Sequence, residues 1–290
     1  MSVIQVGLVD TTGQLEPKLV QATAAALNVQ VIRDLPQYWS VTATVRYLPD
    51  PKQIPVGVWP VFLVAELPPG EGGVHLDKKN QPYALVIGTP ASTDWTLDAS
   101  HETVEMLVDP AGNRLQVSRA IEIAGNDVRD AIGQFEYLVE ACDPCEGSQY
   151  AYTIQGVAVS DFITPRFYDP VATGSARYSY AGHIQRPRQI LPGGYISFTD
   201  PASDSLQQIQ FLGPKPILKN LGAANGKPLR VLSDGGSYTD VRNYRTHKQH
   251  GSDYRRASAT LAKYCTAHRQ IVDAAAIKRG TAYRSLNNKR

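Results

Sequence analysis

The residues best suited to chemistry lie in the stretch Ser-His-Glu-Thr-Val-Glu-Met-Leu-Val-Asp-Pro at positions 100–110. On a helix, His101 and Glu105 would lie about 40° apart on one face, so both side chains can reach one cation. Glu102 occupies the position at which the Glu of the zinc-hydrolase pattern H-E-x-x-H acts as general base. The H-E-x-x-E pattern here predicts a metal site with ligands His101 and Glu105 and catalytic base Glu102. The alternative is a solvated, polar helix face.

The flanking residues favour the helix that this motif needs. Ser92 or Thr93 can cap its start, and Pro110 prevents it from continuing past Asp109. Residues 82–89 are typical of a strand that ends at a turn just before the helix.

The chain upstream alternates between strand and helix patterns. Strands are predicted at 3–9, 41–48 and 58–66, and a long helical stretch at 15–38. This order predicts an α+β fold in which a twisted mixed sheet and a backing helix lie above the metal helix. An extended peptide would then bind along an edge strand near 84–87.

Four residues are predicted to contact such a peptide. Ala84 and Val86 lie on the expected edge strand, and His75 just before it is suited to orienting a substrate carbonyl. Tyr152 can supply a hydrogen-bond donor across the cleft. The alternatives are a loop histidine without a role and a tyrosine that packs against a sheet.

Downstream of the motif, the patterns predict a helix at 127–142 and a hairpin at 150–162 that turns near Gln155-Gly156. A last strand pair is predicted at 193–198 and 205–212, followed by polar sequence with a terminal helix at 257–278.

Composition narrows the class of protein. The 290 residues are 42% hydrophobic and 19% charged, as in ordinary globular proteins, and no window is apolar enough for a membrane helix. The N-terminus lacks the features of a signal peptide, and three cysteines cannot form a disulfide framework. We therefore expect a cytoplasmic protein.

Charge is distributed unevenly. Residues 241–290 hold twelve Lys/Arg and two Asp/Glu, so this segment carries +10 and the preceding residues −8. Such a basic segment is either a solubilising extension or a contact for nucleic acid or an acidic surface.

Three blocks of the sequence resemble a known group. The stretch at 100–110, the block Glu-Ala-Cys-Asp-Pro-Cys-Glu at 140–146 and the stretch Gly-Val-Ala-Val-Ser-Asp-Phe-Ile-Thr-Pro at 156–165 are similar to uncharacterised bacterial and phage-associated zincin-like proteins. The plant phosphate-induced (exordium-type) proteins carry a similar motif. The resemblance covers roughly residues 1–210 and implies a metallopeptidase-type scaffold.

The sequence leaves the identity of the third metal ligand undecided. Zincins that take a Glu from a downstream helix favour Glu140, with Asp143 as an outer partner or alternative ligand; Asp109 is the other alternative. His101 with two carboxylates would neutralise Zn²⁺ and weaken it as a Lewis acid, and hard oxygen ligands make Mn²⁺ or Ca²⁺ competitive.

The cysteines allow a second kind of site. Cys142-x-x-Cys145 and Cys265-x-x-His268 together have the composition of a structural zinc site. Separate thiols are the alternative reading, and no thioredoxin-like pattern surrounds the first pair.

These observations predict a zincin-like metal domain at 1–172, a β-rich extension at 173–212 and a polar, basic tail at 213–290. The predicted function is a zinc-dependent peptidase that acts on extended peptides. The alternative is a non-catalytic structural or assembly protein, virion-associated, whose tail contacts nucleic acid.

Overall fold

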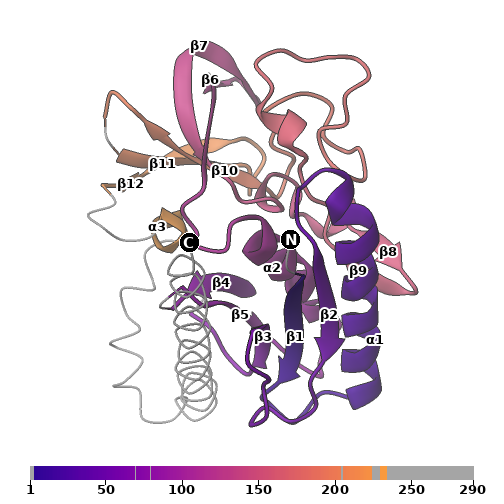
Figure 1. Cartoon of the computed structure of the whole chain (residues 1–290). Helices are drawn as coiled ribbons and strands as arrows, with labels where there is room; N and C mark the ends of the chain where they lie inside the picture. The colour runs from indigo at the N-terminus through magenta and orange to yellow at the C-terminus, as the bar shows by residue number, and fades with distance from the viewer. Residues whose placement is uncertain (1–2, 69, 79, 204, 224–228, 234–290) are drawn as a thin grey trace, which may run out of the picture.

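The first half of the chain builds a mixed sheet with two helices on one of its faces. The structure is a computed structural model that describes residues 3–68, 70–78, 80–203, 205–223 and 229–233 (Figure 1). Five strands lie in the order β2 (Ala43–Tyr47), β1 (Ile4–Asp10), β3 (Val58–Val64), β5 (Pro82–Ile87) and β4 (Gly73–Asp77). All are parallel except β4, which pairs antiparallel with β5 at the edge.

Helices α1 (Pro17–Val29) and α2 (Trp95–Val108) share one hydrophobic core with one face of this sheet. Alternate residues of the central strands point into that core, including Val61 and Leu63 of β3, while Phe62 and Val64 fill a smaller core on the opposite face. The strands are apolar on both faces, as buried parallel strands require.

The helical stretch predicted at 15–38 is confirmed, with a local change of pitch. After α1 the backbone forms a π-helical turn at Gln30–Asp34 and a 3₁₀ turn at Leu35–Gln37. The buried Gln30 side chain accepts a hydrogen bond from Ser100 Oγ (2.8 Å) and donates to the Ser160 carbonyl (2.9 Å). Gln30, in the turn after α1, therefore holds α2 in place at Ser100, the residue before His101.

The second half of the chain forms an antiparallel sheet in the order β12 (Ile217–Gly222), β11 (Ser205–Gln210), β10 (Tyr195–Asp200), β7 (Asp127–Leu138) and β6 (Leu115–Ala124). A small hairpin of β8 (Tyr152–Ile154) and β9 (Val157–Val159) lies beside α2, and a short helix, α3 (Leu229–Ser233), packs near β11 (Figure 1). The molecule is thus α+β with two five-stranded sheets.

Several strand predictions are confirmed and one helix prediction is wrong. The hairpin at 150–162 turns at Gln155-Gly156, where both residues have positive φ, and the pair at 193–198 and 205–212 corresponds to β10 and β11. The helix predicted at 127–142 is instead strand β7. Pairing with β6 and β10 on its two sides determines the conformation here and overrides the local pattern.

Two further predictions change with the topology. The strand that carries Ala84 and Val86 is β5, which lies inside the sheet, so the edge strand is β4 and His75 lies on it. Within the predicted tail, residues 217–222 form β12 and extend the second sheet. β10 pairs with β7, so residues 173–212 share one sheet with the preceding part. The predicted helix at 257–278 and the basic segment lie outside the described residues.

Among the described residues, no helix has the length and apolar character needed to cross a membrane.

One buried arginine ties the long loop after β9 to the second sheet. Arg188 is 1% exposed, and its guanidinium donates to both carboxylate oxygens of Asp130 at 2.9 Å and to Ser118 Oγ at 2.6 Å. Such charge-assisted, bidentate bonds are the strongest of the side-chain hydrogen bonds.

We expect Arg188→Met to lower the free energy of unfolding by about 2–4 kcal/mol, because it leaves Asp130 and Ser118 without their donor. Chemical denaturation measures this loss. The control is Arg166→Met, which removes a half-exposed pair with Asp169 and should cost less than about 1 kcal/mol. Equal losses in both variants would contradict the role given to Arg188.

Candidate metal centre

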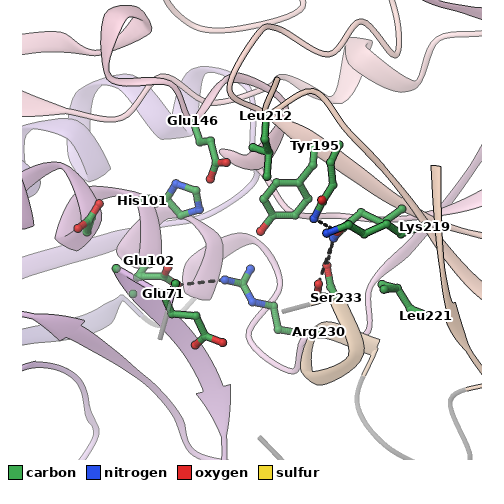
Figure 2. A pocket seen from close by; sticks show the side chains of 16 residues that line it. Glu71, His101, Glu102, Glu146, Tyr195, Leu212, Lys219, Leu221, Arg230 and Ser233 are labelled. Carbon is green, nitrogen blue, oxygen red and sulfur yellow. Dashed lines mark hydrogen bonds and ion pairs between the residues drawn. The ribbon is translucent and has the colours of Figure 1, made fainter. Parts of the chain in front are cut away.

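The predicted motif lies on the floor of a cleft between the two sheets. The cleft has a volume of about 430 Å³ (Figure 2). One side is formed by the segment that leads into β4 and by α2, and the other by the second sheet. Its lining includes Gly70, Glu71, Gly72, Gly73, Asp98, His101 and Glu102 on the first side, and Tyr195, Gln208, Gln210, Leu212, Lys219 and Leu221 on the second, together with Glu146, which follows the 143–145 turn, and Arg230 and Ser233 of α3.

The start of β4 runs against α2 with no room for a side chain. A Cβ on Gly73 would lie 2.7 Å from Glu102 Cγ, and one on Gly72 would lie 2.8 Å from Asp98 Oδ2. The two glycines therefore let the edge strand pass directly over the acidic face of α2. Burial raises the pKa of Asp98 to about 6, and the charge of Glu102 adds to the shift.

His101, Glu105 and Asp143 bring three ligand atoms together. His101 Nε2 lies 3.3 Å from Glu105 Oε2 and 3.1 Å from Asp143 Oδ1, and all three atoms lie within 4.8 Å of one another. One nitrogen and two carboxylate oxygens form a donor set that Zn²⁺ and harder divalent cations accept. The helical spacing of His101 and Glu105 explains their proximity, and Asp143 comes from the turn after β7.

The electrostatics of this group follow from burial and close charge. Burial lowers the pKa of His101, but Glu105, Cys142 and Asp143 together raise it well above its usual value. Burial and the charge of Glu105 raise the pKa of Asp143 to about 7. Glu105 behaves oppositely: burial alone would raise its pKa, but His101 and Arg230 hold it well below the usual range. Glu105 is therefore the ionised centre of the cluster.

His75 forms a second group with Glu102 and Glu105. Its Nδ1 lies 3.5 Å from Glu102 Oε2 and 3.6 Å from Glu105 Oε2, and its Nε2 lies 3.1 Å from the Asp109 carbonyl oxygen. Burial and the charge of Arg230 lower the pKa of His75, but Glu102 and Glu105 raise it above its usual value, so a protonated ring directs its Nδ1–H toward both carboxylates. His75 is thus placed at the site, although its role differs from the substrate contact predicted for a loop residue.

The other two candidate ligands predicted from the sequence, Glu140 and Asp109, have different surroundings. Glu140 is buried near the group, where burial raises the pKa of its carboxyl well above the usual value, although Arg230 opposes the shift. Asp109 Oδ2 accepts the backbone N–H of Arg114 at 2.7 Å, so this carboxylate closes a loop and does not join the donor set. Asp143, in place of the favoured Glu140, is the acidic residue that meets His101.

Arg230 contacts the cluster and was not identified from the sequence. Its Nη1 lies 2.6 Å from Glu105 Oε2 and 2.5 Å from Glu140 Oε2, and its Nη2 lies 3.4 Å from Glu102 Oε2 (Figure 2). The pairs join residues 90 to 128 positions apart. No local motif marks this arginine, which lies within the predicted tail, so only the topology of the second sheet brings it here.

The other predicted substrate contacts do not gather at the cleft. Ala84 and Val86 are fully buried in β5 and belong to the core shared with the helices. Tyr152 donates its hydroxyl hydrogen to Asp34 Oδ2 at 2.9 Å and accepts a hydrogen bond from Gln30 Nε2 at 3.1 Å, so it lies against the π-helical turn after α1. Tyr195 of β10, which was not predicted, lines the cleft instead (Figure 2).

Cys142 contributes to the site through its backbone N–H. The Cys142 N–H donates to Glu105 Oε1 at 3.0 Å and fixes the orientation of this carboxylate. Cys142 and Cys145 are buried free thiols, and burial raises the pKa of each well above its usual value. Cys265 and His268, the other half of the predicted structural zinc site, lie outside the described residues.

The buried polar atoms support a fit to a divalent cation. In the described part of the chain, four buried side-chain N or O atoms have no hydrogen-bond partner, and three of them are His75 Nδ1, Glu140 Oε1 and Asp143 Oδ2. Such atoms are costly to bury without a partner. Two of them belong to residues of the two groups of candidate ligands, and the third belongs to Glu140 beside them, so these residues could hold a divalent cation.

Comparisons of the chain with protein-family models, with curated proteins and with solved structures find no match.

Gly194 sets the position of the turn that carries Asp143. A Cβ at Gly194 would lie 2.5 Å from the Asp143 carbonyl oxygen and 2.8 Å from the carbonyl of Pro144, and backbone atoms cannot move aside as a side chain would. The chain can therefore pass this turn closely just before β10 only because residue 194 is a glycine.

We expect Gly194→Ala to lower the free energy of unfolding by about 1–3 kcal/mol, because the new methyl group forces the 143–145 turn to shift. The matched control is Gly174→Ala, where a Cβ would meet no atom within 4 Å. Chemical denaturation measures the free energy of unfolding of both variants. An unchanged value for Gly194→Ala would contradict the prediction, because it would show that the turn accommodates the methyl group without loss of stability.

Proposed function

We propose that the chain is a metal-dependent hydrolase of extended peptides, with a zincin-like arrangement of sheet and metal helix. The observation that carries the proposal is the meeting of His101 Nε2 with the buried atoms Glu105 Oε2 and Asp143 Oδ1, beside a cleft that His101 and Glu102 line. Those three residues are the proposed ligands of the metal, with Zn²⁺ as the first candidate. When bound, the metal would supply a Lewis acid that polarises the scissile carbonyl.

The topology supports a peptide substrate. In the described residues, β4 is hydrogen-bonded to β5 alone, so its other edge is available to an extended chain. An added strand would gain main-chain hydrogen bonds and would run past Glu102, because Gly72 and Gly73 bring β4 close to α2. The order of elements in the sequence also predicts a twisted mixed sheet above the metal helix, with an edge strand that can hold an extended peptide.

Each residue of the floor has a proposed role. Glu102 lines the cleft and is suited to take a proton from the attacking water and deliver it to the leaving amine. His75 lies 3.5 Å from Glu102 Oε2 and orients this carboxylate. Tyr195 faces the floor from the opposite wall and is suited to donate a hydrogen bond to the substrate oxygen (Figure 2).

The ligand set bears on the choice of metal. One histidine and two carboxylates neutralise a divalent ion, whereas two histidines and one carboxylate leave it a net positive charge. Carboxylate oxygens also suit Mn²⁺ and Ca²⁺. We therefore expect slower hydrolysis than at an H-E-x-x-H centre, and a site that accepts more than one divalent ion.

A second candidate function is a non-catalytic assembly protein built on the same scaffold. The observation that favours it is the contact of Arg230 with Glu105 Oε2, because this guanidinium pairs with an oxygen that the metal would need. The second candidate predicts either that the folded protein binds no metal or that the metal-loaded protein does not hydrolyse peptides.

We expect the chelator-treated, full-length protein to bind about one equivalent of Zn²⁺ or Mn²⁺, and His101→Ala to bind it at least tenfold more weakly, because the variant lacks the nitrogen ligand. Titration followed by elemental analysis measures both. His183→Ala is the matched control, since His183 lies beside Asp161, outside the donor set. Equal binding by wild type and His101→Ala, or less than about 0.2 equivalents in the wild type, would reject the site.

We expect Glu102→Gln to retain the metal and the fold and to reduce peptide hydrolysis by at least about 100-fold, because the amide cannot accept the proton. Unstructured peptide mixtures analysed by mass spectrometry provide the assay. Glu122→Gln, which changes an exposed residue of β6, is the control. Hydrolysis that survives in Glu102→Gln would assign the base to another group, and no hydrolysis by metal-loaded wild type would favour the assembly protein.

A further inference from the structure

We propose that Arg230 is the site's built-in counter-cation, which balances the extra carboxylate of the H-E-x-x-E motif and thereby sets how tightly the centre holds a metal. The part of this inference that concerns metal affinity rests on the proposed function. The part that concerns charge balance rests on the side chains of the chain alone.

The guanidinium lies where three carboxylates converge. Its Nη1 contacts Glu105 Oε2 and Glu140 Oε2 at 2.6 Å and 2.5 Å, and its Nη2 lies 3.4 Å from Glu102 Oε2. Arg230 and these three partners are all at most 4% exposed. Arginine stays protonated at any ordinary pH, and its planar fork can serve several carboxylates at once. The arginine therefore supplies a permanent positive charge in a buried acidic cluster.

The main chain around Arg230 is anchored to two other parts of the molecule. Its N–H donates to the Gly112 carbonyl at 3.1 Å, and the Leu229 N–H donates to Asn113 Oδ1 at 2.9 Å. At the other end of α3, Ser233 Oγ lies 2.7 Å from Ser197 Oγ of β10. These bonds hold α3 between the loop after α2 and the second sheet.

The loop after α2 leaves room for the arginine. Gly112 has a φ of +63°, and a Cβ at this position would lie 2.8 Å from Arg230 Cβ. Figure 2 shows the side chain extending from α3 toward Glu102. The position of the guanidinium is thus determined by backbone contacts as well as by charge.

Charge counting explains why the site needs this residue. Where H-E-x-x-H has a neutral second histidine, this chain has Glu105, so the cluster of Glu102, Glu105, Glu140 and Asp143 carries up to four negative charges. A divalent ion supplies two positive charges and Arg230 one more. Buried charges are tolerated only when they are paired, so the arginine offsets the charge that the motif has gained.

The same contacts place Arg230 in competition with the metal. Glu105 Oε2 faces the guanidinium and is also a member of the His101 donor set. Loss of the guanidinium removes both a competitor for this oxygen and a nearby like charge. We therefore expect loss of the guanidinium to have two effects. The metal-free protein becomes less stable, and the affinity of the site for metal increases.

The first test measures charge balance without metal. In the full-length protein kept in chelator, Arg230→Met is expected to lower Tm, and Arg230→Met combined with Glu105→Gln is expected to recover at least about half of that loss, because the ionised partner of the guanidinium has become neutral. Arg230→Lys should fall between, since it keeps the charge but not the fork. Additive losses in the double variant would overturn the proposal, because they would mean that Arg230 only packs.

The second test measures metal affinity by titration with Zn²⁺ and Mn²⁺. Arg230→Met is expected to bind at least about tenfold more tightly than wild type, and the metal should raise its Tm by more than it raises that of the wild type. A purely packing role would lower Tm equally with and without metal and leave the affinity unchanged, and that result would overturn the inference. If no variant binds metal, the proposed function fails, and the double-variant comparison still decides whether Arg230 is the counter-cation.

Discussion

The packing of this molecule depends on how it accommodates several carboxylates in one buried place. Glu102, Glu105, Glu140 and Asp143 are each at most 4% exposed and lie around the same floor. An isolated buried carboxylate is strongly destabilising, so the surrounding chain has to supply donors and positive charge. His101, Arg230 and the backbone N–H of Cys142 do so. Each of these three donors comes from a different part of the fold, so the two sheets are held together partly by the charges of the site.

This arrangement explains why the cleft has walls of such different origin. The first sheet contributes the edge strand and, through α2, the acidic face, and the second sheet contributes Tyr195 and the support for α3. Glycine is needed at two close approaches of the backbone: Gly73 above Glu102 within the first half, and Gly194 against the Asp143 turn within the second. The geometry of the floor is thus set by backbone approach as much as by the ligands themselves.

The sequence predicts the first half of the fold better than the second. The strands and helices up to residue 108 follow local hydrophobic patterns, and the spacing of His101 and Glu105 places them together on any helix. The strand at 127–138 carries no such signal, because its conformation depends on partners from 115–124 and 195–200. Asp143 was only an alternative ligand and Arg230 was not considered, because their proximity to His101 arises from long-range pairing that spacing cannot reveal.

The position of Arg230 along the chain has a consequence for biosynthesis. A ribosome releases the first sheet, α2 and Glu140 long before residue 230 emerges, and at about 5–20 residues per second this interval lasts several seconds or more. During that time the acidic floor lacks its guanidinium, and His101 is a cationic partner of Glu105 in the part of the chain already synthesised. The carboxylates of the floor can therefore reach their final charge balance only after residue 230 has been added and α3 has packed against the loop after α2.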